Sequence, residues 1–180
     1  MRALQWCANA GMPVLISNPG LLTPQSELEY ARPSHFDEAL RTMPKLRLVF
    51  GDLGRAFSEE ALAMIAKHPG AFAEISTLAG RVGGLHRTLL DAYERGVMHK
   101  LLFGSGFPSE TPQRAIERIF SVSSFGGVPP AAPREALRAL VERDAMAALG
   151  LEHWPAARGR VNAQDALART RRTLEVGGPA

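Results

Sequence analysis

The chain has 180 residues, of which 46% are hydrophobic and 22% are charged, the ordinary composition of one globular domain or part of one. The single cysteine, Cys7, excludes an intramolecular disulfide and a cysteine-rich zinc site, and it fits the reducing environment of a cytoplasmic protein. A net charge of only +3 and the lack of a long apolar run argue against nucleic-acid and membrane partners.

Short apolar runs alternate along the chain with helical patterns. These patterns predict helices at residues 2–10, 35–43, 59–67, 85–95, 112–120, 134–149 and 163–174. The apolar runs predict strands at residues 13–16, 46–50, 71–75 and 100–103. The predicted helix N-caps are Ser34, Ser58 and Thr111. A spacing of about 25–35 residues between strands is typical of right-handed βαβ units, so we expect four parallel strands.

Each predicted strand ends in a short polar or glycine-rich turn. In folds built from parallel βα units, functional side chains lie on these turns, at the carboxyl ends of the strands. Asp52 is the best candidate for a catalytic residue, because it follows the second strand between Gly51 and Gly54. The alternative is a turn aspartate that hydrogen-bonds its own backbone and caps the next segment.

Four further residues are candidates for substrate binding, because we expect them in loops on the same side of the sheet. They are Asn18, Arg32, His35 and Arg81. The two arginines are suited to an anionic substrate, and the alternative for each is a solvated surface arginine. The alternative for His35 is a partly exposed surface histidine.

Five segments of the chain together carry a resemblance to a known family. They are residues 11–16, 44–54, 67–69, 100–108 and 148–151. In this order they resemble the C-terminal half of the amidohydrolase-related family of metal-dependent hydrolases and decarboxylases. The resemblance implies an α/β fold over residues 1–152, in which four parallel βα units form the C-terminal half of a (β/α)8 TIM-like barrel with extra C-terminal helices. Residues 153–180 are expected to form a tail with one weak helix.

The resemblance also implies a divalent metal, Zn or Mn, and particular residues to bind it. The family has histidines after the strands that correspond to residues 13–16 and 46–50, and an aspartate after the strand at 100–103. Ser17, Asp52 and Gly106 stand at these positions. The family's His-x-His pair belongs to a strand without a counterpart in this sequence. Because a catalytic zinc needs about three protein ligands, Asp52 is the one metal ligand we predict, and the alternative is that no metal binds.

Two functions stay open at this point. The first is an amidohydrolase-like hydrolase or carboxy-lyase that acts on small carboxylated substrates, with a degenerate metal site and doubtful activity on its own. The second is a non-catalytic scaffold or interaction subunit, a pseudoenzyme, that completes a barrel with a partner chain. Four βα units leave unpaired sheet edges, so we expect a homo-oligomer or a separate partner chain. A truncated gene product is a third possibility.

Overall fold

The computed structural model describes residues 1–17, 23–76, 82–122 and 131–151, and residues 1–150 of the chain form one compact unit. The fold and the site below lie within that unit. The helix predicted at residues 163–174 and the tail at 153–180 lie outside the described residues.

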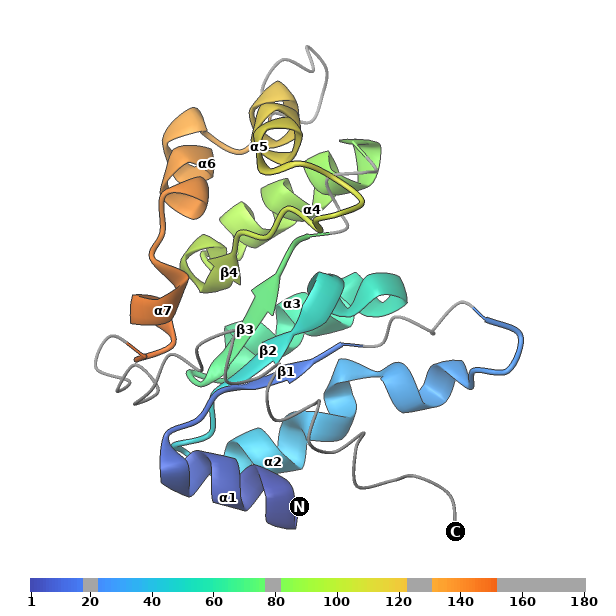
Figure 1. Ribbon diagram of the computed structural model, residues 1–180, viewed down its shortest axis with the longest axis vertical. Coiled ribbons are helices and arrows are strands. Elements are labelled where there is room, and N and C mark those ends of the chain that lie inside the picture. Colours follow the sequence, from blue (N-terminus) through green and yellow to red (C-terminus); the bar gives the residue numbers. More distant parts are fainter. Residues whose placement is uncertain (18–22, 77–81, 123–130, 152–180) are drawn as a thin grey trace, which may run out of the picture. The chain divides into compact units, whose positions relative to one another are not determined.

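A single sheet of four parallel strands forms the centre of this unit (Figure 1). The strands are β1 (Val14–Ile16), β2 (Leu48–Phe50), β3 (Ala71–Glu74) and β4 (Leu101–Leu102). Each strand pairs with the one before it, in the order β1-β2-β3-β4. This sequential order is that of a (β/α)8 barrel, whereas a doubly wound sheet reverses its order part-way. The predicted α/β fold of parallel βα units, part of a TIM-like barrel, is confirmed.

Helices connect the strands and cover one face of the sheet. They are α1 (Arg2–Ala10), α2 (Asp37–Thr42), α3 (Ser58–Lys67), α4 (Val82–Glu94), α5 (Pro112–Ser121), α6 (Arg134–Val141) and α7 (Ala145–Ala148). Short 3-10 turns are η1 (Leu28–Ala31), η2 (Pro33–Phe36), η3 (Gly51–Phe57) and η5 (Met98–Lys100). Among the described helices, none combines the length and the apolar character that a membrane span requires.

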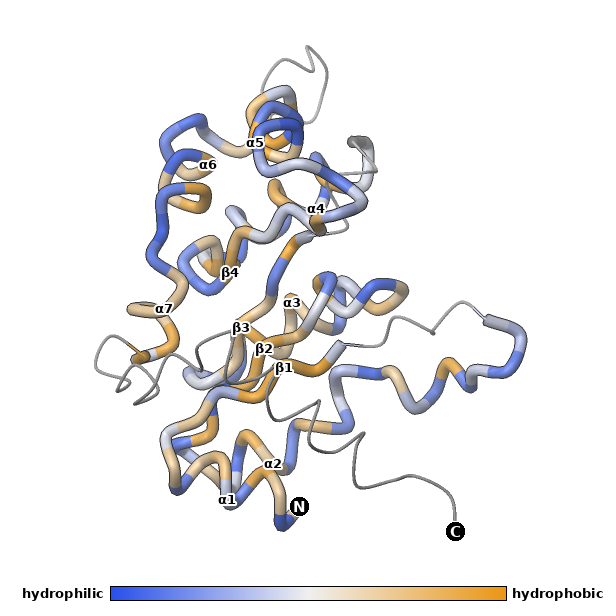
Figure 2. Tube along the Cα trace, viewed as in Figure 1, coloured by the Kyte–Doolittle hydropathy of each residue, from blue (hydrophilic) through white to orange (hydrophobic). Residues whose placement is uncertain are grey.

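The apolar core lies between the sheet and these helices. The strand register places Leu48, Phe50 and Ala73 on the same face of the sheet, because side chains alternate along each strand. Leu62 and Ile65 of α3 are fully buried in the same core. Each fully buried leucine or isoleucine contributes about 1.5–3 kcal/mol through removal of apolar surface from water. Figure 2 shows this concentration of hydrophobic residues along the strands.

Two of the three predicted N-caps are wrong. Ser58 is the first residue of α3, and Phe57 precedes it without a side-chain cap. Ser34 lies in η2, where its backbone N–H donates to Oε1 of Glu60 at 2.7 Å. Each serine lies inside a helical segment, η2 or α3, rather than at the position before it. The prediction for Thr111 is confirmed, because its Oγ1 accepts from the backbone N–H of Arg114 at 3.4 Å.

The helix predicted at residues 134–149 is two helices. The helix α6 ends at Val141, and Asp144 caps the separate helix α7 by accepting from the backbone N–H groups of Met146 and Ala147. Between them, Nη1 of Arg143 donates to the carbonyls of Met98 and Leu101, at 2.8 and 2.7 Å. The break therefore positions an arginine that satisfies backbone acceptors at the start of β4.

Candidate functional site

The carboxyl ends of the four strands meet at one edge of the sheet, and Asp52 lies at this edge directly after β2. Its side chain is 8% exposed, which is unusual for an aspartate unless it is paired. The Nε atom of Arg55 donates to Oδ2 of Asp52 at 2.8 Å, and the hydroxyl of Ser76 lies 3.0 Å from Oδ1. Both carboxylate oxygens of Asp52 therefore have a partner.

The turn that holds Asp52 has an uncommon backbone. Asp52, Leu53, Gly54 and Arg55 have φ angles of 52°, 47°, 69° and 50°, all in the left-handed region. Each such non-glycine residue costs about 1–2 kcal/mol relative to the right-handed region, although aspartate tolerates it better than leucine or arginine. The cost is offset by complete burial of Leu53 and by the ion pair that joins the two ends of the turn.

Glu74, the last residue of β3, is a second carboxylate at this edge, and the sequence analysis did not single it out. Its Oε1 accepts from the backbone N–H of Asp52 at 2.6 Å, and its Oε2 accepts from the backbone N–H of Ser76 at 2.8 Å. The Ser76 hydroxyl lies 3.0 Å from Oε1 of Glu74, the same distance as from Oδ1 of Asp52. Hydrogen bonds to an ionised acceptor are the stronger kind, so Glu74 ties the ends of β2 and β3 together.

We refer to Asp52, Arg55, Glu74 and Ser76 as the strand-end cluster. One signal in the sequence could have identified Glu74, namely an acid inside the apolar run at residues 71–75. The signal for Arg55 is weaker, because a left-handed turn with three non-glycine residues has no sequence marker apart from Gly54.

The turn after β4 packs closely against the strand-end cluster. A Cβ atom added to Gly104 would lie 3.0 Å from Oε2 of Glu74, and one added to Gly106 would lie 3.2 Å from the carbonyl oxygen of Ser76. Gly106 also has a φ of +73°, which favours glycine. The resemblance places an aspartate at this position, and here neither the space nor the backbone suits one.

The residues at this edge do not fit the metal ion that the resemblance implies. Among the described residues, no three His, Cys, Asp or Glu side chains are grouped as metal ligands. The Arg55 guanidinium already supplies a cation on Asp52. A catalytic zinc needs about three nitrogen, sulfur or carboxylate donors, whereas Ser17 offers a hydroxyl and Gly106 has no side chain.

The structure places Arg32 and His35 in a different network. Nε of Arg32 donates to Glu29 at 2.8 Å, and its Nη1 donates to Glu60 at 2.9 Å. The hydrogen bond to Glu29 is the main cause that raises the pKa of Arg32 above its ordinary value. Nε2 of His35 lies 2.7 Å from the carbonyl oxygen of Glu29. These contacts tie η1 and η2 to α3, and neither residue belongs to the strand-end cluster.

The two other predicted binding residues, Asn18 and Arg81, lie outside the described residues. Their role as substrate-binding residues stays a prediction.

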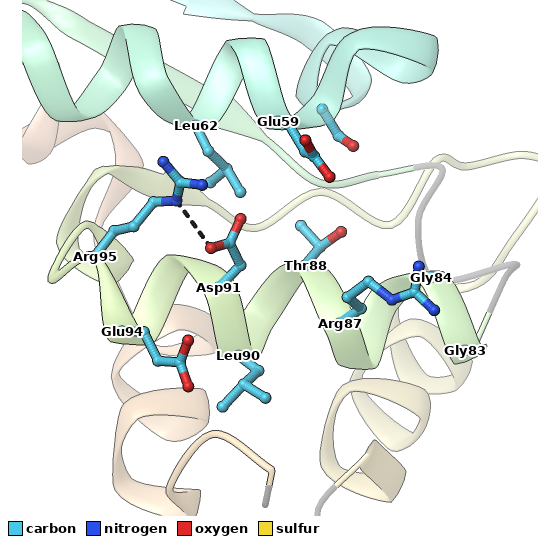
Figure 3. Close-up of a pocket in the computed structure, with 11 residues that line it drawn as sticks. Glu59, Leu62, Gly83, Gly84, Arg87, Thr88, Leu90, Asp91, Glu94 and Arg95 are labelled. Carbon is cyan, nitrogen blue, oxygen red and sulfur yellow. Dashed lines mark hydrogen bonds and ion pairs between the residues drawn. The ribbon is translucent and has the colours of Figure 1, made fainter. Parts of the chain in front are cut away.

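A cavity of about 570 Å³ lies between α3 and α4 (Figure 3). Glu59 and Leu62 of α3 face Thr88 and Asp91 of α4, and Arg95 directly after α4, across it. Nε of Arg95 donates to Asp91 at 2.8 Å within this wall. The cavity is lined by acids and arginines together, so it has no charge preference that would indicate a ligand class.

Comparison with known proteins gives the family context of this geometry. The family model described as "Amidohydrolase" matches residues 1–151. No curated protein matches the chain. A solved structure of an uncharacterised TIM-barrel protein from Bordetella bronchiseptica is similar, with a TM-score of 0.60 and 19% sequence identity. The match covers 83% of this chain and 50% of that one, so the chain spans about half of that barrel protein.

Proposed function

Since the chain belongs to the amidohydrolase family, we propose that it is an amidohydrolase-like protein with a degenerate metal site that binds small carboxylated molecules. The observation that supports the degenerate site is the ion pair between Arg55 and Asp52, 2.8 Å long and mostly shielded from water. A metal ion at Asp52 would have to displace this guanidinium and would find too few other donors. Metal-dependent hydrolysis or decarboxylation by these residues alone is therefore not part of the proposal.

Within this proposal, Asp52 contributes by holding Arg55 in place. Both of its carboxylate oxygens are engaged, by Arg55 and by Ser76, and its side chain is mostly buried. Glu74 acts as a positioning residue, because it bonds the backbone N–H of Asp52 and the hydroxyl of Ser76. Arg32 is engaged by two glutamates, so we do not assign it to substrate binding.

The metal content of the purified full chain tests the degenerate site. After incubation with Zn²⁺ or Mn²⁺ and removal of free metal, we expect less than about 0.1 metal ion per chain, because one carboxylate holds a divalent ion only weakly. Asp52→Ala should leave this value unchanged, and so should Asp144→Ala, a control at an exposed helix cap. A stoichiometric metal ion that Asp52→Ala removes and Asp144→Ala retains would overturn the proposal.

A second candidate function is a subunit that completes a barrel with a partner chain, and the edges of the sheet favour it. Among the described strands, β1 pairs only with β2, and β4 pairs only with β3. Leu15, in the middle of the edge strand β1, is 60% exposed. An exposed apolar edge strand is a template for pairing with another strand.

The native mass of the chain in solution tests this candidate. If a second copy pairs with β1, the wild type is a dimer and Leu15→Lys is a folded monomer, because a charged edge residue blocks strand pairing. Leu28→Lys, which changes another half-exposed leucine in η1 rather than in the sheet, is the matched control. A wild type that is monomeric when alone and in a lysate would exclude the subunit role.

A further inference from the structure

A small cavity lies at the carboxyl ends of β1 and β2, beside the strand-end cluster. Its volume is about 80 Å³, and its apolar walls include Ile16, Pro33, Phe36 and Phe50. The Phe36 and Phe50 rings meet edge to face with centroids 6.2 Å apart, which fixes the shape of this wall. A well-formed apolar cavity with few polar groups is the usual form of a small-molecule site.

Arg55 lines the cavity and retains unused donors. An arginine side chain has five N–H donors. Nε bonds Asp52, and no described residue accepts a hydrogen bond from the Nη atoms of Arg55. Its side chain is 27% exposed and lines the cavity, so a ligand in the cavity can contact it. The left-handed turn and the ion pair hold the guanidinium in place, which reduces the entropy lost when a ligand binds.

Arg32 of the same chain shows how such an arginine binds a second carboxylate. Its Nε holds Glu29 at 2.8 Å, while its Nη1 holds Glu60 at 2.9 Å. Arg55 has the equivalent first contact through Nε to Asp52 and lacks the second. A ligand carboxylate would therefore occupy, on Arg55, the position that Glu60 occupies on Arg32. Planar guanidinium groups suit carboxylates at both sides in this way.

The two acids of the strand-end cluster, Asp52 and Glu74, are not among the residues that line this cavity. The carboxylate of Glu74 is satisfied by the backbone N–H groups of Asp52 and Ser76, at 2.6 and 2.8 Å. A second polar group, the exposed hydroxyl of Ser17, lines the same cavity and has no hydrogen-bond partner among the described residues. Arg55 and Ser17 therefore both offer hydrogen-bond donors to a ligand. No acidic side chain is among the described residues that line the cavity.

The volume of the cavity limits the size of the ligand. An apolar cavity of about 150 Å³ is known to hold benzene. At about 80 Å³, this cavity suits a chain of a few carbon atoms better than an aromatic ring.

We propose that this cavity binds a short aliphatic monocarboxylate, whose carboxylate contacts the free Nη donors of Arg55 and the Ser17 hydroxyl while its alkyl chain packs on Phe36 and Phe50. The inference rests on the proposed function only for the carboxylated class of ligand, and it needs neither a metal ion nor turnover.

Titration of the ¹⁵N-labelled full chain with propionate, followed by NMR, tests the proposal. We expect saturable shifts of the Ser17 and Arg55 amide signals, with a Kd on the order of 1–10 mM for so small a ligand. Propionamide, the neutral isostere, should bind about tenfold more weakly, because it loses the charge-assisted contact. The proposal would be overturned if propionate binding did not saturate, or if propionamide bound as tightly as propionate. This test needs no variant of the chain.

Two arginine variants add a matched comparison. Arg55→Gln should weaken propionate binding about tenfold. Arg95→Gln should leave it unchanged, although Arg95 makes the same kind of Nε contact to an aspartate, also at 2.8 Å. Ser17→Ala, at an exposed position, serves if Arg55→Gln does not fold, and it should weaken binding about threefold. If Arg55→Gln, or Ser17→Ala in its place, bound propionate as tightly as the wild type does, the proposal would be overturned and the metal result left untouched.

Discussion

The Nε atom of Arg55 lies 2.8 Å from Oδ2 of Asp52, and both residues have left-handed backbone conformations. The charge of Asp52 and its backbone conformation therefore make separate contributions to the free energy of unfolding. Two substitutions distinguish these contributions. Asp52→Asn keeps a side chain that tolerates positive φ but loses the ion pair, so we expect a loss of about 1–3 kcal/mol of unfolding free energy. Asp52→Ala should cost about 1 kcal/mol more. Urea denaturation followed by circular dichroism measures both. Equal stability of Asp52→Ala and the wild type would contradict this account of the turn.

Glu74→Gln tests whether the second carboxylate ties β2 to β3. A glutamine side chain has one acceptor oxygen, so it cannot accept from the backbone N–H groups of both Asp52 and Ser76 as the two Glu74 oxygens do. We expect a loss of about 2–3 kcal/mol in urea denaturation. Glu117→Gln changes an exposed acid that bonds Gln113 on α5, and it should shift stability by less than about 0.5 kcal/mol. Similar small effects from both substitutions would refute the role of Glu74.

Gly54→Ala tests the space inside the turn that follows β2. Gly54 has a φ of +69°, and an added Cβ would lie 3.1 Å from Cβ of Ala61 and 3.2 Å from Cγ of Pro33. Gly96 has a nearly equal φ of +70° with nothing within 4 Å of an added Cβ. Gly96→Ala should therefore cost about 1 kcal/mol from the backbone alone. Gly54→Ala should cost about 1 kcal/mol more from crowding. Thermal unfolding of the two variants gives the comparison, and equal costs would show that the neighbours move freely.

Asp37 makes an acid-sensitive contact outside the strand-end cluster. A hydrogen bond from Lys67, and another from His68 at 2.7 Å, lower the pKa of the Asp37 carboxyl below its ordinary value of 3.8. A lowered pKa in the folded state favours folding above the ordinary pKa, and this contribution is lost as the pH falls through the lowered value.

We therefore expect Asp37→Asn to be less stable than the wild type at pH 7, with a difference that shrinks as the pH falls below 3.8. Urea denaturation across this range measures the difference. Glu38→Gln, a change of the next acid in α2, is the control for the loss of one negative charge from the same helix. If the difference in unfolding free energy between Asp37→Asn and the wild type stayed constant with pH, the Asp37 carboxylate would not be the source of the acid sensitivity.

The sequence pattern predicted the architecture because the apolar runs are short and regularly spaced. The runs at residues 46–50 and 71–75 contain β2 and β3, although each strand is shorter than its run. A residue at the end of such a run must lie at the carboxyl edge of the sheet, which is why Asp52 was predicted there. Its edge position follows from chain order alone.

The partners of Asp52 could not be predicted in the same way. Arg55 reaches it only because four residues in a row adopt left-handed backbone, a conformation that leucine and arginine disfavour on their own. The buried side chain of Leu53 overrides that local preference. Glu74 and Ser76 reach Asp52 from another strand, 22 and 24 residues along the chain. The break before α7 also depends on distant atoms, since Arg143 bonds the carbonyls of Met98 and Leu101.

The Ser76 hydroxyl carries one hydrogen atom and lies 3.0 Å from an oxygen of Asp52 and 3.0 Å from an oxygen of Glu74. It can donate to one carboxylate at a time, so the other oxygen faces a lone pair of the hydroxyl. Rotation about the Cβ–Oγ bond of Ser76 turns this hydrogen from one carboxylate to the other with no heavy atom displaced. The ends of β2 and β3 therefore share a single donor that can serve either strand.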